Sequence, residues 1–337
     1  MRNGIIAGGN WIVDHIKVID RWPTQDALAS ILREDKSGGG SPYNILKDLA
    51  RLGTAIPLAA VGLVGDDEDG RAIIRDCQAH GIDTAQLRVN PAAATSYTDV
   101  MTVAHDGRRT FFHQRGANAA LGPEHFALAG SSAKILHFGY LLLLDRLDEL
   151  HNGRPRACEV LTRARDAGMI TSLDCVSEDG NRFQTIVGPV LPCVDVFFAN
   201  DFEAEKVTGI PLRSGGRLDA QAVGLSARNL LNRGVQAWVI IHFPEAVYAL
   251  GRSGREFWQA SLNMPPADIV GAAGAGDALA AGVLLGLHEN WSMDECLRLG
   301  VCAAAASLAH ASCSEGVRPV NECLALARRY GYRTLPS

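Results

Sequence analysis

A glycine-rich loop directly before an apolar helical segment is the part of the sequence best suited to chemistry on a phosphate. The loop, residues 271–276, contains only glycine and alanine, and Asp277 and the small, apolar run 278–286 follow it. Free N–H groups at a helix N-terminus attract anions, and small residues let a phosphate approach the backbone. An aspartate beside a phosphate is unfavourable unless it has a task, and the natural task is to accept a proton from an attacking hydroxyl. The alternative is that Asp277 only caps the helix.

Two better-known phosphate-binding loops do not fit the sequence. A Walker A loop needs Gly-Lys followed by Ser or Thr; of the lysines only Lys36 has such a neighbour, and Asp35 precedes it. A Rossmann loop beginning at Gly274 would need glycine where Leu279 stands, and it would lie far from the first strand. If the protein handles ATP, it therefore uses another architecture.

A second group of polar residues follows the apolar segment 194–199. Asn200 and Glu203 are three residues apart, so they share a face if a helix begins there. The carboxyl end of a parallel strand faces the usual ligand crevice, and an oxygen pair of this kind can hold the water shell of Mg²⁺. The alternative is a helix cap with acidic residues in the first turn.

A third group combines two glycines with a carboxylate and an amide. Gly39 and Gly40 precede Asn44, and Asp14 follows the first strand. A carboxylate can accept hydrogen bonds from two adjacent sugar hydroxyls, and an amide can both donate and accept. The alternative is that Asp14 and Asn44 cap turns.

The elements that must position these groups alternate between strands and helices. We expect strands at 4–7, 56–64, 135–138, 170–173, 194–199 and 237–241. We expect helices at 43–52 and 69–80, the first after a turn-like segment at 37–42, and further helices between the later strands. This alternation predicts an α/β fold of three layers, α/β/α, with a mostly parallel central sheet. We expect one domain, residues 1–337.

Two stretches with strand character fall outside the alternation. One is at about 11–20, and the other, at about 96–113, reads as two strands around the turn Asp106-Gly107. We expect both to contribute to a small β-sheet lid. The exposed β surface of such a lid predicts a homodimer formed through paired lids.

Composition excludes several classes of function. The 337 residues include 32 Lys and Arg against 37 Asp and Glu, a net charge of −5, which argues against a general nucleic-acid binder. No apolar run approaches the ~20 residues needed to cross a membrane, and the first residues do not resemble a signal peptide. The eight cysteines form no C-x-x-C pair and no zinc-type spacing. We expect a cytoplasmic protein with reduced thiols, a small-molecule substrate, and neither nucleic acid nor membrane as partner.

Together, the motifs resemble the ribokinase (PfkB-type) family of carbohydrate and nucleoside kinases over most of the chain. The matching segments stand in the family's order. They are Gly9 with Asp14, G-G-x-x-x-N and A-R-L-G at 39–53, G-x-V-G-D-D-x-x-G at 62–70, D-G-x-R-T at 106–110, N-x-x-E at 200–203 and G-A-G-D at 274–277. Each motif is weak alone, and six in this order are a strong signal.

The resemblance implies a ribokinase-like fold and an ATP-dependent kinase that transfers the γ-phosphoryl group in line to a hydroxyl of a sugar or nucleoside, expected to be a primary hydroxyl. It implies Asp277 as the general base. The family's other roles fall on three sets of residues. They are Gly274, Ala275 and Gly276 for the anion hole, Asp14, Gly39, Gly40 and Asn44 for the substrate, and Asn200, Asp174 and His242 for the nucleotide or its phosphates. Glu203, with Asn200, would act on Mg²⁺ through water.

The sequence departs from the family pattern at two places. The family signature usually begins with an acid and a hydroxyl residue where Gly271 and Ala272 stand, in a neighbourhood that holds a monovalent cation in many relatives. Whether such a cation acts here is left open. The family's nucleotide stretch usually carries glycines, whereas positions 243 and 246 hold Phe and Ala, which leaves the phosphoryl donor open. His242 could contact phosphate or serve only as a structural residue.

Two other functions compete with a kinase. A non-catalytic member of the same fold, binding a sugar or nucleoside, is favoured by the missing glycines and opposed by the intact Asp277. A nucleotide-dependent oxidoreductase is disfavoured by the mismatch to the Rossmann loop. Nothing in the sequence selects one sugar or nucleoside.

Overall fold

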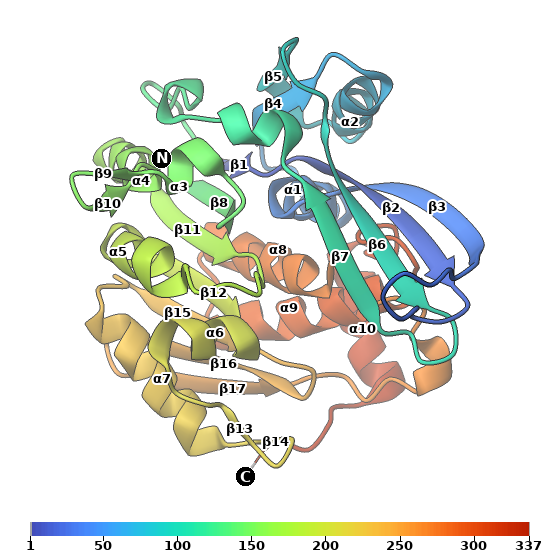
Figure 1. The fold of residues 1–337 in the computed structure, drawn as a ribbon. Helices are drawn as coiled ribbons and strands as arrows, with labels where there is room; N and C mark the ends of the chain where they lie inside the picture. The colour runs from blue at the N-terminus through green and yellow to red at the C-terminus, as the bar shows by residue number, and fades with distance from the viewer. Residues whose placement is uncertain (1, 337) are drawn as a thin grey trace.

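The central feature of the molecule is a twisted sheet. The computed structural model describes residues 2–336, and in that range nine strands pair in the order β17-β16-β15-β12-β11-β8-β1-β4-β5 (Figure 1). Their bounds are β1 Ile5–Gly9, β4 Leu58–Gly65, β5 Asp83–Asn90, β8 Ile135–Leu141, β11 Ile170–Cys175, β12 Val196–Asn200, β15 Trp238–His242, β16 Ala246–Gly251 and β17 Glu256–Ala260. The pairs from β5 through β15 are parallel. The expected parallel sheet is thus present.

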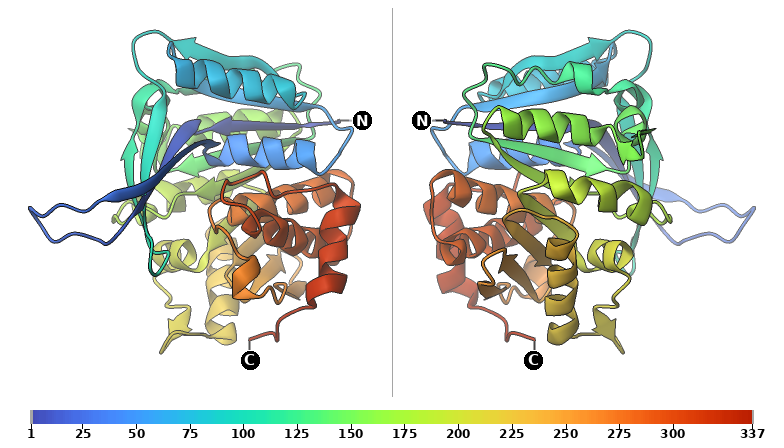
Figure 2. Two further views of the ribbon diagram at one scale, coloured as in Figure 1. Left: turned by 90° about the vertical axis from the view of Figure 1, so that its right-hand side faces the viewer. Right: turned by 90° about the vertical axis from the view of Figure 1, so that its left-hand side faces the viewer.

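Helices cover both faces of this sheet, which gives the three-layer α/β/α fold (Figure 2). One face carries α1 Ser41–Arg51, α2 Glu68–Ala79, α8 Ala275–His288, α9 Met293–Leu308 and α10 Val320–Tyr330. The other carries α4 Ala157–Asp166, α5 Gly188–Val190, α6 Asp201–Thr208 and α7 Ala220–Asn232. Strands such as β1 are buried along their whole length because both faces are covered. In the range 2–336 no helix is long and apolar enough to cross a membrane.

The helix that begins at the glycine-rich loop is buried on nearly all sides. Residues 278–286 of α8 are buried, as expected for a helix that is apolar all round. Small residues let it approach α9 closely: a Cβ added to Gly282 would lie 2.9 Å from Gly300 Cα. This packing fixes the start of α8 at the edge of the sheet.

A separate four-stranded sheet forms the lid, in the order β3-β2-β6-β7. Its strands are β2 Ile12–Ile19, β3 Ile31–Gly39, β6 Ser96–Val103 and β7 Arg109–Gln114. The hairpin of β2 and β3 projects from the body of the molecule (Figure 2). The expected lid stretches are therefore strands, and β3 joins them as a third stretch.

Three sequence-based expectations differ from the structure. The segment 37–42, expected to be a turn, contains the end of β3 and the start of α1. The strand is not apparent in the sequence because β3 is a polar edge strand without apolar alternation. β5 was not anticipated, since its residues are mostly polar and exposed. β16 and β17 were also missed; they are antiparallel because their connections are too short for a crossover helix.

The fold also contains four very short strands and one short helix. They are β9 Leu150–His151 with β10 Arg154–Pro155, β13 Arg213–Ser214 with β14 Arg217–Leu218, and α3 Asp145–Asp148. α3 lies in the segment that follows β8. The assignment of the whole chain to one domain stays a prediction.

Candidate active site

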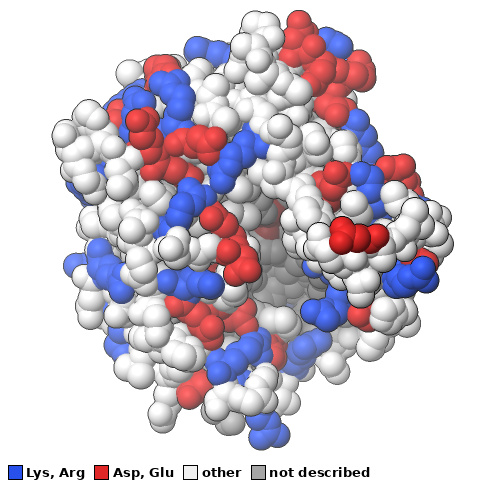
Figure 3. All heavy atoms as spheres, viewed as in Figure 1, with Lys and Arg blue, Asp and Glu red and all other residues white. Residues whose placement is uncertain are grey.

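A cavity of about 790 Å³ lies between the lid and the carboxyl ends of the central strands. Figure 3 shows the hollow at the centre of this face of the molecule. Most of the residues selected from the sequence line it, namely Asp14, Gly40, Asn44, Asp174, Asn200, Glu203, His242, Gly274, Gly276 and Asp277. Gly39 and Ala275 do not line the cavity but are adjacent in sequence to residues that do. The fold thus brings together groups that are up to 263 residues apart, from Asp14 to Asp277.

The start of α8 presents backbone rather than a capping side chain. Gly274 is the N-cap residue, with a φ of 78° that favours glycine. A Cβ added there would also lie 2.6 Å from Cys313 Cβ. The first N–H groups of a helix have no partner within the helix, and glycine offers them no side chain. Asp277 is the third residue of α8, so the alternative that it is the helix N-cap is wrong.

Asp277 is buried at the floor of the cavity, with 6% of its surface exposed. Its Oδ2 accepts a 2.7 Å hydrogen bond from Asn44 Nδ2. Burial, followed by the charge of Asp174, raises the pKa of Asp277 to about 7, and the Asn44 amide opposes this rise. A carboxylate whose pKa lies near neutrality is well suited to take up a proton during turnover.

The two glycines before α1 make room for a carboxylate and for the turn into the helix. A Cβ added to Gly39 would lie 2.3 Å from Asp14 Oδ2. Gly40, the N-cap of α1, has a φ of 91°, and a Cβ there would lie 2.1 Å from the Asn10 carbonyl oxygen. Asp14 lies inside β2 and Asn44 inside α1, so the alternative that they cap turns is wrong.

The lid places a row of polar side chains over the cavity. Asp14 pairs in register with Thr98, and Thr98 with His113, so the three side chains lie side by side on one face of the sheet. Thr98 Oγ1 and His113 Nδ1 are 3.0 Å apart. Burial raises the pKa of Asp14 to about 6, against the charge of Arg109. Sequence reasoning missed Thr98 and His113, because only strand register reveals them.

Asn200 and Glu203 form a reciprocal helix cap. Asn200 Oδ1 accepts from the Glu203 N–H at 2.8 Å, and Glu203 Oε2 accepts from the Asn200 N–H at 3.0 Å. Ser177, which sequence reasoning missed, donates to Glu203 Oε1 at 2.7 Å. The structure therefore confirms that Asn200 and Glu203 cap the helix. The cap also holds the Glu203 carboxylate at the cavity wall.

Neighbouring carboxylates of the cavity raise one another's pKa. Burial, then the charges of Asp174 and Asp277, raises the pKa of Glu203 to about 8. Among residues 2–336, no cluster of three or more His, Cys, Asp or Glu side chains is placed to hold a metal ion directly. The oxygen atoms of Glu203 and Asn200 are of the kind that can hold the water shell of Mg²⁺.

Asp174, at the end of β11, links three elements of the site. Its Oδ2 accepts from Ser41 Oγ at 2.6 Å and its Oδ1 from the Tyr140 N–H at 2.9 Å. His137 Nε2 lies 3.0 Å from the same Ser41 hydroxyl. Both oxygens of Asp174 are thus engaged by protein donors, and its charge acts on Asp277 from a fixed position.

His242 ends β15 beside the first turn of α8. A Cβ added to Gly276 would lie 3.0 Å from His242 Cε1. Burial lowers the pKa of His242 to about 4, so the imidazole is neutral at pH 7. A neutral imidazole can donate or accept one hydrogen bond at this wall but supplies no charge to a phosphate.

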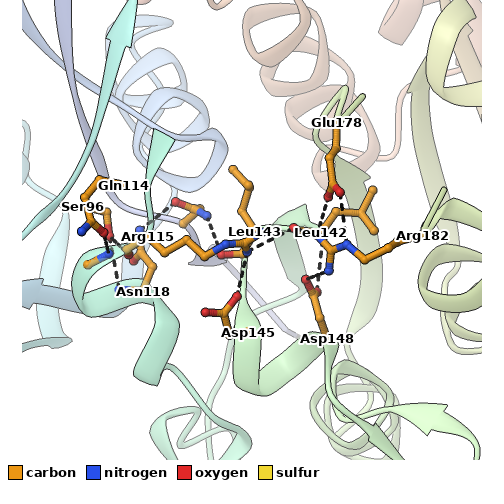
Figure 4. Close-up of polar contacts among 12 residues, drawn as sticks. Ser96, Gln114, Arg115, Asn118, Leu142, Leu143, Asp145, Asp148, Glu178 and Arg182 are labelled. Carbon is orange, nitrogen blue, oxygen red and sulfur yellow. Dashed lines mark hydrogen bonds and ion pairs between the residues drawn. The ribbon is translucent and has the colours of Figure 1, made fainter. Parts of the chain in front are cut away.

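Two arginines hold the rim of the cavity after β8 (Figure 4). Arg115 and Arg182 both donate to the Leu142 carbonyl oxygen. Leu142 has a φ of 84°, which is rare for a residue with a side chain. Its N–H donates to Asp148 Oδ1 at 3.1 Å, and Arg182 lies 3.4 Å from the other oxygen of Asp148. These bonds stabilise a strained rim that carries Tyr140 and Leu143 into the cavity wall.

Comparison with family models identifies the group to which this site belongs. The model described as "pfkB family carbohydrate kinase" matches residues 9–319, most of the chain. The chain belongs to the pfkB family of carbohydrate kinases. The expected family is therefore confirmed, and the general role of the family is that of a sugar kinase.

Individual pfkB relatives differ in what their names say they act on. The chain is 32% identical over 195 residues to an ATP-dependent ribose-1-phosphate kinase of Halopiger xanaduensis, covering 58% of this chain but only 60% of that protein. It is 25% identical over 301 residues to a 5-dehydro-2-deoxygluconokinase of Shouchella clausii, covering 86% of this chain and 85% of that one.

Solved structures confirm the ribokinase-like fold. An Arabidopsis thaliana ribokinase complexed with ribose and ATP superposes with a TM-score of 0.75 at 20% identity, covering 97% of this chain and 99% of that chain. At this level of identity the likeness shows the fold alone. The roles of individual pfkB site residues in this chain stay predictions.

Proposed function

We propose that this protein is an ATP-dependent kinase that transfers the γ-phosphoryl group to a hydroxyl, expected to be primary, of a sugar or nucleoside. The observation that carries the proposal is the position of Asp277, a buried carboxylate with a pKa of about 7 in the first turn of α8, beside the first backbone N–H groups of that helix. A base and an anion site are thus adjacent at one end of one cavity.

In this mechanism Asp277 takes the proton from the acceptor hydroxyl as that oxygen attacks phosphorus. The N–H groups of Gly274, Ala275 and Gly276 stabilise the charge that develops on the transferred phosphoryl group. Asn44 holds the carboxylate of Asp277 in one orientation by its 2.7 Å hydrogen bond.

The acceptor would lie between the lid and α1. Asp14, Gly39 and Gly40 would bind its hydroxyls, and the unpartnered, buried Oδ1 of Asn44 could accept from one of them. The nucleotide would lie toward the ends of β11, β12 and β15, where Asp174, Asn200 and His242 line the cavity. Mg²⁺ supplied with the nucleotide would neutralise phosphate charge, and Glu203 with Asn200 would hold its water shell. Gly271, in place of the family's acid, leaves the need for a monovalent cation open.

We also propose a homodimer formed through the lids, in the cytoplasm. The lid exposes large apolar side chains: Leu28 is 79% exposed, Leu32 60% and Phe112 51%. Covering such residues with a second lid would remove them from water and pair an edge strand. Light scattering during gel filtration should give twice the chain mass, and a monomer at all concentrations would contradict this part of the proposal.

The experiment that tests the kinase activity is ADP release on a panel of sugars and nucleosides with Mg-ATP. We expect at least one acceptor to raise ADP release well above the acceptor-free rate. The non-catalytic alternative predicts calorimetric binding of an acceptor with no ADP release. Nucleoside triphosphates other than ATP belong in the panel. The connection between β15 and β16 carries no glycine, which leaves the phosphoryl donor open.

A further inference from the structure

One cation lines the cavity between the lid and the central sheet. Among residues 2–336, Arg109 is the single Lys or Arg that does so. It begins β7, where its neighbours Arg108 and Thr110 are exposed and it is half-buried. The side chain of Arg109 therefore faces the cavity and is less exposed than those of its two neighbours.

The guanidinium of Arg109 has no partner in the part of the chain that the structure describes. Among residues 2–336, its side chain makes no hydrogen bond, and no carboxylate oxygen lies within 4.0 Å of its nitrogens. Burial lowers the pKa of Arg109, and the nearby Asp14 and Cys313 partly offset this effect. The rim arginines Arg115 and Arg182, by contrast, bind carbonyl and carboxylate oxygens. A half-buried guanidinium with five free donors is suited to a phosphate or carboxylate.

A second unpartnered group lies on the same face of β7. Arg109, Phe111 and His113 alternate along the strand, so their side chains share the face toward the cavity. His113 Nε2 is buried and has no partner among residues 2–336. Burial lowers the pKa of His113 to about 4, so this ring contributes a hydrogen bond without a charge at pH 7. The lid thus offers both a charged and a neutral group to a ligand.

The lid places Arg109 at the acceptor end of the cavity. It shares one face of β7 with His113, and His113 stands in the row of polar lid residues beside Thr98 and Asp14. The residues assigned above to the nucleotide stand on β11, β12 and β15, at the ends of central strands. An anion held by Arg109 would therefore belong to the acceptor.

We propose that the acceptor is an anionic sugar, carrying a phosphate or a carboxylate, and that Arg109 binds this anionic group. The proposal rests on the kinase function proposed above and narrows its substrate class. The anion would lie under the lid, the sugar hydroxyls at Asp14 and Asn44, and the accepting hydroxyl at Asp277. A neutral sugar would leave the guanidinium desolvated and unpaired, which disfavours its binding.

The test compares matched anionic and neutral acceptors with Arg109→Gln and with the control Arg108→Gln, which changes the exposed neighbour. The probes are ribose 1-phosphate against ribose, and gluconate against glucose. We expect kcat/KM at least tenfold higher for the anionic member of one pair. We expect Arg109→Gln to lower that value by on the order of 10- to 100-fold, with KM for ATP unchanged. Arg108→Gln should match the wild type.

Two results would overturn the proposal while leaving the kinase intact. One is an unchanged preference between anionic and neutral acceptors in Arg109→Gln. The other is a KM for ATP that rises equally with every acceptor, which would assign Arg109 to the nucleotide phosphates. If no acceptor in any panel is phosphorylated, the kinase function fails separately. Calorimetric binding of the same four probes to wild type and Arg109→Gln then still decides whether Arg109 binds the anion.

Discussion

Asn44 Nδ2 donates a 2.7 Å hydrogen bond to Asp277 Oδ2, joining α1 to α8 across 233 residues of sequence. Both side chains are buried, and both elements belong to the same layer of helices. The bond couples the segment that would hold the acceptor to the carboxylate that would take its proton. Several predictions on the proposed mechanism depend on this contact.

The pH dependence of turnover should follow Asp277. Its pKa is raised from 3.8 to about 7, chiefly by burial, and a general base acts in its ionised form. We expect kcat to rise about tenfold per pH unit below pH 7 and to level off above it. For stability the sign is opposite: because the folded-state pKa is the higher one, ionisation of this group destabilises the fold as pH rises from about 4 to 7. A steady-state pH profile between 5 and 9 checks the first point.

Replacing Asn44 should shift that profile. The Asn44 amide favours the ionised form of Asp277, so Asn44→Ala should move the apparent pKa of turnover upward by about one unit. Asn321→Ala, on the exposed face of α10, is the control and should leave the profile unchanged. A lower kcat with an unshifted pKa would show that Asn44 does not act through Asp277.

Gly274 should be intolerant of a side chain for two separable reasons. Its φ is 78°, and an added Cβ would lie 2.6 Å from Cys313 Cβ, so Gly274→Ala should displace the N–H groups of the first turn. We expect kcat to fall on the order of 100-fold. Gly254 has a φ of 82° but open space around it, so Gly254→Ala controls for backbone strain and should lower only Tm. Equal kcat for both variants would argue against an anion hole at this loop.

Asp48 is predicted to limit stability. It is fully buried in α1, and neither carboxylate oxygen has a hydrogen-bond partner among residues 2–336. Burial raises its pKa well above the ordinary value, so ionisation costs stability as pH rises above that value. Asp48→Asn keeps the shape and removes the charge, so its Tm should exceed that of the wild type at pH 8 and approach it at pH 4. A Tm below that of the wild type at pH 8 would show that the charged form is compensated in the fold.

The sequence predicts those parts of the site that depend on residue type and on order along the chain. The loop before α8, the end of β12 and Gly40 before α1 all line the cavity. The ends of β11 and β12 meet there because parallel strands end at one edge of a sheet. The parallel strands β1, β4, β8, β11, β12 and β15 were also recognisable, since burial on both faces leaves continuous apolar runs.

The features that the sequence does not predict depend on strand register and on edge strands. Thr98 and His113 join Asp14 only through the pairing of β2, β6 and β7, which no local pattern encodes. β3 is an exposed edge strand with charged residues, so it lacks the alternation by which strands are recognised. The inward position of Arg109, beside the exposed Arg108, likewise follows from the face that β7 turns to the cavity.

The most direct test of the central claim is single-turnover phosphoryl transfer by Asp277→Asn, with saturating Mg-ATP and an acceptor identified in the panel. Asn keeps the shape of the side chain but cannot accept the proton. We predict a rate about 10²- to 10⁴-fold below wild type with acceptor binding retained, while Asp294→Asn, an exposed acid in the first turn of α9, keeps the wild-type rate. A rate for Asp277→Asn within tenfold of wild type would contradict the assignment of Asp277 as the general base.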